Sequence, residues 1–335
     1  MLVGYISTVI KMTILEVKDL KKHYTIGGLF SSKYLVKAVD GVSFKIEEGD
    51  NFALVGESGC GKSTIAKIIA RLIEPTDGTV FFKGNEIFHD FKNKDNIFRR
   101  NIQMIFQDVY ASLNPRRTVF QIISDPLKNN KLGNNDAIFN RVVTLLKDVG
   151  LTPFESFIYR FPHQLSGGQR QRVGIARALS LEPSFILADE PVSALDMTVR
   201  TQILLLLKAL QVKHNLTFFF ITHDLSVVRA ICNKVTVMYL GRIMEMSPTE
   251  DLFKNPSHPY TQALISATPI PNPEKARQKK KLLVKGETPS PINPPSGCHF
   301  HTRCPYTMDI CKKAEPELLS IGKNRFASCH KLQNS

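Results

Sequence analysis

The segment at positions 56–63 limits the fold of this 335-residue chain more than any other feature, and it reads Gly-Glu-Ser-Gly-Cys-Gly-Lys-Ser. It fits the pattern G-x-x-x-x-G-K-[ST], follows a short apolar run and opens a stretch with apolar residues at helical spacing. Glycines at these positions let backbone N–H groups approach a phosphate, and the start of a helix adds partial positive charge. The segment therefore predicts a strand, a phosphate-binding loop and a helix in succession.

Short apolar runs predict the sheet behind this loop. Phe52–Val55, Phe185–Ala188 and Thr217–Thr222 are continuously apolar, which is typical of strands buried on both faces of a parallel sheet. Residues 14–20 and 42–46 instead alternate apolar and polar side chains, which predicts half-exposed antiparallel strands.

Helical spacing accounts for much of the remaining chain. A helix that ends before Pro75 is indicated by apolar residues at i, i+3, i+4 and i+7, namely Ile65, Ile68, Ile69 and Leu72. A second helix is expected at about Thr198–Val212, and residues 108–180 look mainly helical, so we interpret them as a helical subdomain. We therefore expect an α/β fold with a P-loop ATPase core: a mostly parallel sheet, an antiparallel β subdomain and this helical subdomain.

Several side chains have the chemistry of a nucleotide site. Lys62 is suited to reach the β and γ phosphates, and Ser63 to ligate Mg²⁺. Asp189 and Glu190 end a buried strand, where open α/β sheets place their ligands, so one acid can serve Mg²⁺ and the other the attacking water. Cys60 is interpreted as a small loop residue. The loop residues expected to bind ATP are Gly56, Glu57, Ser58, Gly59, Cys60, Gly61, Lys62, Ser63 and Thr64.

The segment Leu165-Ser166-Gly167-Gly168-Gln169 narrows the choice among P-loop ATPases. Ser166 is a natural N-cap, and the helix that begins at about Gln169 would point its N-terminus at an anion. With this segment the chain resembles the ATPases of ABC transporters over residues 14–250. Other elements of that family follow in order: Tyr24, Gln107, the turn at 193–196 that ends in Asp196, and His223.

The resemblance implies a role for each of these residues. Tyr24 would stack on adenine, although it also fits a plain aromatic residue on an edge strand. Gln107 would touch Mg²⁺ and water beside Ser63 and Asp189, His223 would contact the γ-phosphate, and Glu190 would polarise the attacking water. Catalysis is thus assigned to Glu190, His223, Gln107 and Lys62.

The same resemblance implies a dimer. In this family the signature segment of one subunit closes over ATP held by the other, so Ser166, Gly167, Gly168, Gln169 and Asp196 are expected at a nucleotide. The chain carries one set of ATPase motifs and no internal repeat. We therefore expect a second ATPase subunit, which is non-identical in the subfamily described next.

Three stretches resemble the ATPases of oligopeptide and dipeptide importers: the insertion at 27–37, the segment at 107–116, and His-Pro-Tyr-Thr-Gln-Ala-Leu at 258–264. Val109 stands where that subfamily usually has proline. The resemblance implies two permease subunits, an extracytoplasmic solute-binding protein and a peripheral position at the cytoplasmic face of the membrane. Peptide is the expected cargo, with nickel or an oligosaccharide as alternatives.

Charge alone leaves another class of function open. Lys and Arg exceed Asp and Glu by 44 to 30, which suits phosphates, nucleic acid or an anionic membrane surface. A soluble ABC ATPase acting on nucleic acid or the ribosome is the alternative, but the chain has no twin cassette or coiled coil, so no nucleic acid is expected. No apolar run approaches the roughly 20 residues that span a bilayer, and the opening residues lack the features of a signal peptide.

Four of six cysteines crowd into the last tenth of the chain, at Cys298, Cys304, Cys311 and Cys329. In a reducing compartment such crowding favours a metal over disulfides. The spacings match neither a ferredoxin nor a zinc ribbon, so iron–sulfur and zinc both remain open on chemistry alone. The subfamily resemblance implies a structural [4Fe–4S] cluster on four thiolates, and cysteines on the surface without a metal are the plain alternative. One of the adjoining histidines, at 299, 301 and 330, could replace a cysteine as ligand, but four thiolates complete the count, so we interpret the histidines as solvent-facing neighbours.

These features divide the chain into an ATPase domain at 12–255 and a C-terminal extension at 256–335. The extension has a proline-rich, basic linker at 269–297 and a cysteine-rich, metal-binding segment at 297–330. The basic residues suit a solvated surface, or contact with membrane phosphates or a partner. Because the cysteines and the phosphate loop share no residues, we expect loss of Cys311 to leave ATP binding at Lys62 nearly intact.

Overall fold

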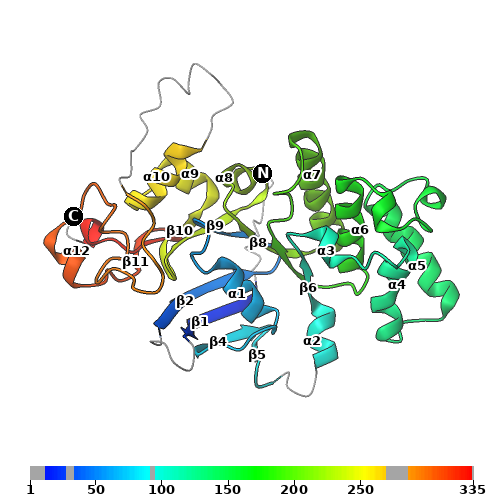
Figure 1. The fold of residues 1–335 in the computed structure, drawn as a ribbon, viewed down its shortest axis with the longest axis horizontal. Coiled ribbons are helices and arrows are strands. Elements are labelled where there is room, and N and C mark those ends of the chain that lie inside the picture. The colour runs from blue at the N-terminus through cyan, green and yellow to red at the C-terminus, as the bar shows by residue number, and fades with distance from the viewer. Residues whose placement is uncertain (1–11, 28–33, 91–94, 269–285, 334–335) are drawn as a thin grey trace, which may run out of the picture.

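The computed structural model describes residues 12–27, 34–90, 95–268 and 286–333. The part of the chain that it describes contains a larger mixed sheet of eight strands and a smaller antiparallel sheet (Figure 1). In sheet order, the larger one consists of β11 (Leu319–Gly322), β12 (Arg325–Ala327), β10 (Arg242–Pro248), β9 (Lys234–Tyr239), β3 (Asn51–Val55), β8 (Thr217–Thr222), β7 (Phe185–Asp189) and β6 (Ile102–Ile105). The five strands from β9 to β6 are parallel, and the other three pair antiparallel.

The smaller sheet holds both of the strands predicted from alternating sequence. Its order is β2 (Tyr34–Glu47), β1 (Thr13–Ile26), β4 (Asp77–Phe82) and β5 (Asn85–Glu86). Val17 of β1 pairs with Phe44 of β2, and both side chains are buried. The prediction of half-exposed antiparallel strands is therefore confirmed.

The central strands β3, β7 and β8 of the larger sheet are mostly apolar because both of their faces are covered. Phe52 and Leu54 of β3 point to the side that holds α1 (Lys62–Ile69) and the smaller sheet, where Phe52 lies 5.8 Å from Phe219 between ring centroids. Ala53 and Val55 point to the opposite side, into the core formed with the other helices. Alternate residues thus enter two separate cores, as the period of a strand requires.

The first helix is shorter than its sequence pattern predicts. α1 ends at Ile69, and Leu72 is 53% exposed beyond it, so including Leu72 was wrong. Arg71 has φ 53°, a left-handed conformation that stops an α-helix. The helix therefore presents Ile65, Ile68 and Ile69 to the core and ends there.

Helices fill residues 108–180, at the right of Figure 1. They are α3 (Val109–Ser112), α4 (Val119–Asn129), α5 (Asn135–Asp148) and α6 (Gly167–Leu179), with two single 3₁₀ turns at 154–156 and 162–164. Thr118 and Asn134 cap α4 and α5 by accepting bonds from backbone N–H groups, which satisfies donors left over at each helix start. The bounds of these helices as a subdomain stay a prediction.

The remaining helices surround the larger sheet. They are α2 (Asp95–Asn101), α7 (Met197–His214), α8 (Leu225–Ile231), α9 (Thr249–Lys254) and α10 (Pro259–Ala267). The second helix expected from sequence corresponds to α7. Among the described residues, no helix is both long and apolar enough to cross a membrane.

The C-terminal segment is part of the main sheet rather than a separate appendage. It contains α12 (Asp309–Lys313), β11, β12 and α13 (His330–Gln333). β12 pairs with β10, where Ala327 faces Glu245, and Phe300 is fully buried in the same core as the sheet. The expectation of a small unit appended by a linker is therefore revised. Positions 269–285 of the predicted linker, with its basic residues, lie outside the described residues.

Candidate functional site

The phosphate loop joins β3 to α1, and two of its glycines are dictated by close backbone approach. A Cβ on Gly61, whose φ is 108°, would lie 2.0 Å from the carbonyl oxygen of Ala38 in β2. A Cβ on Gly56 would lie 2.1 Å from the carbonyl oxygen of Met238 in β9. No side chain fits at either position, so the loop is seated against both sheets.

Lys62 is buried within this loop and is 6% exposed. Its Nζ donates to the carbonyl oxygens of Gly56, at 2.8 Å, and Glu57, at 2.9 Å. A buried ammonium held by neutral carbonyls gains from an anionic partner, so the loop suits a phosphate. Ser58 and Gly59 are exposed at the loop tip, Ser63 is exposed at the start of α1, and Thr64 is half-buried.

Cys60 has the passive role expected of it. The thiol is buried, and burial raises its pKa, so the reactive thiolate is disfavoured. Its Sγ lies 3.7 Å from Lys62 Nζ, which the carbonyl oxygens of the loop also hold.

Asp189 ends β7 close to the loop, and its environment suits a cation. Burial raises the pKa of this carboxyl, and the neighbouring Glu190 carboxylate raises it further. Within the described residues, its buried Oδ1 has no hydrogen-bond partner. An orphaned buried carboxylate oxygen beside a second carboxylate has the chemistry of a Mg²⁺ ligand, and Ser63 and Gln107 are the other ligands expected from sequence.

Two residues singled out in the sequence, Gln107 and His223, contact the carboxylate of Glu190. Gln107 Nε2 donates to Glu190 Oε2 at 2.8 Å, and His223 Nδ1 lies 2.7 Å from Glu190 Oε1. Gln107 lies just beyond β6, Glu190 follows β7, and His223 follows β8. These are neighbouring parallel strands, so their carboxyl ends bring the three side chains to one edge of the sheet.

The backbone of Glu190 is held in an unusual conformation. Its φ is 45°, in the left-handed region, and its N–H donates to the carbonyl oxygen of Ile221 at 2.8 Å. A non-glycine residue in this region is uncommon and is often found at functional sites. Here it turns the chain sharply after β7, and the carboxylate lies between Gln107 and His223.

The signature segment forms the start of α6. Ser166 Oγ accepts from the N–H of Gln169 at 3.3 Å, and Gln169 Oε1 accepts from the N–H of Ser166 at 2.9 Å, a reciprocal capping box. The helix begins at Gly167, two residues before the expected start. A Cβ on Gly168 would lie 2.5 Å from Val199 Cγ1, so this glycine permits close packing of α6 on α7.

The signature segment and the phosphate loop lie on different parts of the chain (Figure 1). α6 packs against α3, α4, α5, α7 and β6, whereas α1 packs against β2, β7 and β8. Asp196 caps α7 by accepting from the N–H groups of Thr198 and Val199. Gly167 of the signature segment lines one cavity with Gln107, Glu190 and His223, whereas the packing of α6 is on other elements than that of α1, which begins at the phosphate loop.

Tyr24 lies on β1, opposite Val36 of β2. Its side chain is 37% exposed, and Lys22 Nζ lies 5.2 Å from the ring centroid. Both the adenine contact and the plain edge aromatic fit this position, so the role of Tyr24 stays a prediction.

Glu57 has a set of partners that the sequence did not reveal. Its carboxylate accepts from Arg303 Nη1 at 3.0 and 3.1 Å and from the hydroxyl of Thr288, while its N–H donates to the hydroxyl of Tyr260 at 3.0 Å. All three partners come from the C-terminal 80 residues. The tail and the phosphate loop are thus in direct contact, which sequence spacing does not encode, and the expected independence of ATP binding from Cys311 stays a prediction to be tested.

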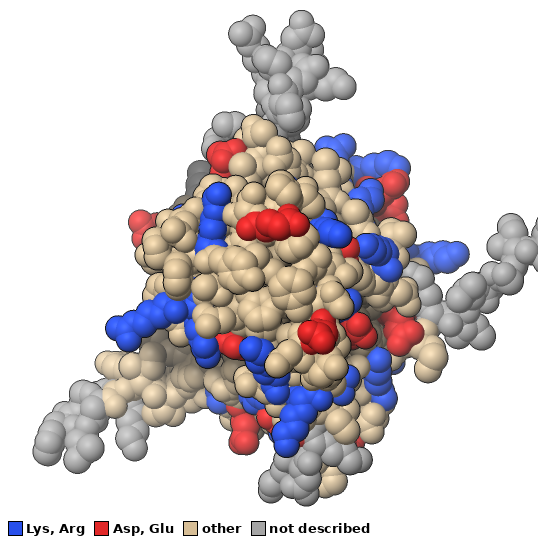
Figure 2. All heavy atoms as spheres, turned by 90° about the vertical axis from the view of Figure 1, so that its right-hand side faces the viewer, with Lys and Arg blue, Asp and Glu red and all other residues tan. Residues whose placement is uncertain are grey.

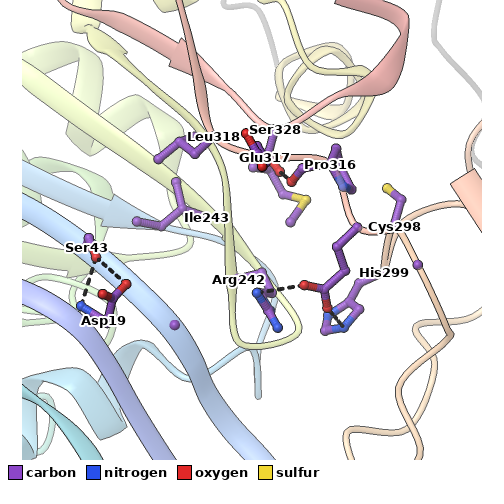
Figure 3. A pocket seen from close by; sticks show the side chains of 14 residues that line it. Asp19, Ser43, Arg242, Ile243, Cys298, His299, Pro316, Glu317, Leu318 and Ser328 are labelled. Atoms are coloured by element: carbon purple, nitrogen blue, oxygen red, sulfur yellow. Dashed lines mark hydrogen bonds and ion pairs between the residues drawn. The ribbon is translucent and has the colours of Figure 1, made fainter. Parts of the chain in front are cut away.

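A second link joins the tail to the core through Arg242, which Figure 3 labels beside Cys298 and His299. Arg242 donates to Asp40 at 2.8 Å and to Glu315 at 2.9 Å, so it joins β2 to the C-terminal segment. The cavity in that figure lies beside this guanidinium and is also lined by Asp19, Ser43 and His299.

The four tail cysteines line one small cavity with His258, Phe300 and Tyr306. None of them is in a disulfide. Burial raises the pKa of Cys298 to about 12 and raises the pKa of Cys304 and of Cys329. Among the described residues, however, no group of three or more Cys, His, Asp or Glu side chains is arranged to hold a metal ion.

The three tail histidines bond to backbone. His299 Nδ1 lies 2.9 Å from the carbonyl oxygen of Leu240, His301 Nδ1 lies 2.9 Å from that of Cys298, and His330 Nε2 lies 2.9 Å from that of Ala314. His299 and His330 are buried, at 5% and 6% exposed, so the interpretation of these two as solvent-facing was wrong.

Two families match the chain. The family described as ABC transporter matches residues 39–193, and the family described as oligopeptide/dipeptide transporter, C-terminal region, matches residues 244–311. The second match covers the segment that reaches from β10 through Arg303 to Cys311.

Curated relatives and solved structures are similar over most of the chain. The oligopeptide transport ATP-binding protein AppF of Bacillus subtilis is 50% identical, covering 95% of this chain and 97% of that protein. The di/tripeptide transport ATP-binding protein DppF of Pseudomonas aeruginosa is 44% identical, covering 95% and 97%. The dimeric, post-hydrolysis structure of the ATP-binding cassette MJ0796 with ADP and Pi superposes with a TM-score of 0.62 at 32% identity, covering 70% of this chain and 98% of that one.

Proposed function

This chain belongs to the ATP-binding subunits of the oligopeptide and dipeptide ABC transporters, and from that membership we propose that it hydrolyses ATP to drive peptide import. The observation that carries the proposal is the contact of Gln107 and His223 with Glu190 beside the phosphate loop. These groups have the chemistry that phosphoryl transfer to water requires: a phosphate cradle, a cation site and a positioned carboxylate.

Each residue of the site has a defined task in this proposal. Lys62 turns from the carbonyls of Gly56 and Glu57 to the β and γ phosphates, and the loop amides hold the same groups. Mg²⁺, held by Ser63, Gln107 and Asp189, would neutralise charge on those phosphates. Glu190 accepts a hydrogen bond from the attacking water, because each carboxylate oxygen keeps a free lone pair beside its bond to Gln107 or His223.

A second ATPase subunit completes the site. α6 packs against α3, α4, α5, α7 and β6, whereas α1, which begins at the phosphate loop, packs against β2, β7 and β8. We infer that Ser166, Gly167, Gly168, Gln169 and Asp196 act on ATP held by a partner, whose own signature segment closes over Lys62. A non-identical partner is proposed because the chain resembles a subfamily that commonly pairs two different ATPases.

Membrane partners account for the exposed aromatic residues next to Gln107. Phe106 is 38% exposed and Tyr110, at the start of α3, is 60% exposed. We propose that this surface contacts one of two permease subunits at the cytoplasmic face of the membrane, so that motion of Gln107 reaches the permease. A solute-binding protein outside the cell would deliver the cargo, and that cargo is peptide rather than nickel or an oligosaccharide, as the names of AppF and DppF suggest.

The face that carries α4 and α5 gives no support for action on nucleic acid or the ribosome. Figure 2 views the side of α4 and α5, where Lys and Arg are interspersed with Asp and Glu around an uncharged centre. Binding to a phosphate backbone uses a stripe of one sign, and this face has none.

We further propose that residues 12–255 form the ATPase domain and that the extension at 256–335 closes around a metal. Support comes from the donor set, since Cys298, Cys304, Cys311 and Cys329 line one cavity. Four thiolates suit a [4Fe–4S] cluster, with zinc as the alternative. Its role would be structural, and no step of ATP hydrolysis passes through it.

Purification of this chain from native membranes in mild detergent tests the proposed function. The expected result is a complex that contains a second, different ATPase subunit and two membrane-spanning permease subunits. Recovery with nucleic acid or ribosomal proteins, and without a membrane protein, would contradict it.

A further inference from the structure

We propose that Arg303 is a positioning residue for the phosphate loop, and that the cysteine-bearing segment controls nucleotide affinity through it. This rests on the proposed function of the loop as an ATP site. Arg303 belongs to the turn between Cys298 and Cys304, and Glu57 belongs to the loop. The two residues are 246 positions apart in sequence.

The contact between Arg303 and the loop is made through one nitrogen of the guanidinium, and among the described residues the buried Nε has no hydrogen-bond partner. One nitrogen, Nη1, donates to both carboxylate oxygens of Glu57, at 3.1 and 3.0 Å, and lies 3.3 Å from the hydroxyls of Tyr239 and Thr288. The Arg303 side chain is 12% exposed and that of Glu57 is 28% exposed. Charge-assisted hydrogen bonds of this kind are stronger than those of an open surface pair.

The body of the chain holds Arg303 in place. Phe300, three residues earlier, is fully buried, with its ring centroid 5.4 Å from Tyr239 and 5.2 Å from Tyr260. The N–H of Arg303 donates to the carbonyl oxygen of Phe300 at 3.0 Å. Glu315 anchors the same segment to β10 through its ion pair with Arg242. The guanidinium is thus presented to the loop by a packed turn rather than by a free tail.

Glu57 is the point at which this contact can act on nucleotide. Its carbonyl oxygen holds Lys62 Nζ, its N–H is held by Tyr260, and its carboxylate is held by Arg303. A loop fixed before the ligand arrives loses less entropy on binding. A carboxylate at this position would also repel a triphosphate if it were unpaired, and Arg303 neutralises it.

Nucleotide affinity and the pairing of Arg303 with Glu57 are tested by a double-mutant cycle on the full chain. The probe is a fluorescent ATP derivative with Mg²⁺, titrated at equilibrium. Arg303→Ala is expected to weaken binding about tenfold, a common size for coupling between sites. Because Glu57→Gln removes the repulsion, Arg303→Ala should have little further effect in that background.

Two matched variants separate positioning from general stability. Arg303→Lys should recover part of the affinity, since a single nitrogen makes all of the contacts and an ammonium can replace it. Lys312→Ala removes an exposed cation that pairs with Asp309 in the same segment, and it should bind like the unmodified chain. If Arg303→Ala does not fold, Arg303→Gln, which keeps the polar contacts without the charge, takes its place in the cycle.

Unchanged affinity in Arg303→Ala, or an equal loss with and without Glu57→Gln, would overturn the proposal while the proposed function stands. Failure of the unmodified chain to bind the nucleotide would overturn both. In the assembled transporter, a raised KM for ATP with kcat retained is the expected kinetic signature of a positioning residue. A fall in kcat alone would contradict that role.

Discussion

Glu190 and His223 are joined by a contact of 2.7 Å between Oε1 and Nδ1, although they are 33 positions apart in sequence. Gln107 holds the other carboxylate oxygen at 2.8 Å. The two contacts fix one acid at the edge of the sheet from strands on either side of it.

Glu190→Gln is expected to keep ATP binding and to lower steady-state hydrolysis by about a hundredfold or more, because the water loses the anionic carboxylate that polarises it and the amide oxygen is a far weaker base. Lys62 and the loop amides are untouched by this change. ATP affinity and turnover should be measured on the same preparation. Turnover equal to that of the unmodified chain would show that another group activates the water.

Lys62→Ala should act on binding instead. The ammonium is buried, and charge-assisted bonds to phosphate are worth about 1.5–3 kcal/mol, so the affinity for ATP should fall by about tenfold or more. Equilibrium titration with Mg²⁺-ATP is the measurement, and Lys67→Ala, an exposed lysine on the same helix, is the control. A loss of turnover at unchanged affinity would place Lys62 in the chemical step alone.

Sequence reasoning located the strands that carry the site because their patterns follow from burial. Phe52–Val55, Phe185–Ala188 and Thr217–Thr222 are apolar since each lies between two cores, and the structure has strands at all three. The end of α1 was missed because Leu72 keeps the helical spacing, while a left-handed Arg71 has already stopped the helix. The spacing of apolar residues indicates which side chains share a helix face. It does not indicate the backbone conformation that ends the helix.

The contacts of the tail were beyond sequence reasoning for a different reason. Arg303 has no local pattern that distinguishes it from other surface arginines, and its partner Glu57 is 246 positions away. Pairing of β12 with β10 brings the tail to the core, and a three-residue strand gives almost no signal in sequence. The close spacing of the cysteines in the sequence drew attention to them. That spacing does not predict that Arg303, which lies between two of them, contacts the phosphate loop.

The stability of the chain should fall in mild acid through His258. Burial lowers the pKa of this imidazole to about 3, whereas an unfolded histidine titrates near 6.5. The unfolded chain therefore takes up a proton below about pH 6.5 that the folded chain refuses, so the contribution is complete above pH 6.5 and is lost as the pH falls toward 3.

Between pH 7.5 and 5.5 this group should lower the free energy of unfolding by about 1 kcal/mol. His258 also caps α10 through Nδ1, which accepts from the N–H of Tyr260, and His258→Asn keeps a capping acceptor. Urea unfolding at both pH values compares the two chains. An equal change in both would show that His258 is not responsible.

Metal analysis of anaerobically purified protein tests the cysteine segment. About four irons per chain and a brown colour are expected if Cys298, Cys304, Cys311 and Cys329 hold a [4Fe–4S] cluster. Cys311→Ser should bleach the protein and loosen residues 297–330 to proteolysis. Given the contact of Arg303 with Glu57, it should also weaken ATP binding. One zinc and no iron, in protein never exposed to air, would contradict the cluster.

Transport by the purified complex in lipid vesicles tests the central claim most directly. ATP is enclosed in the vesicles, on the side of this subunit, and the solute-binding protein is added outside. A labelled oligopeptide should then accumulate inside the vesicles only while ATP is hydrolysed. The Glu190→Gln complex, assembled in the same way, should bind ATP and move no peptide. Equal uptake by both complexes, or hydrolysis by the unmodified complex without peptide uptake, would contradict the assignment of this chain as the motor of a peptide importer.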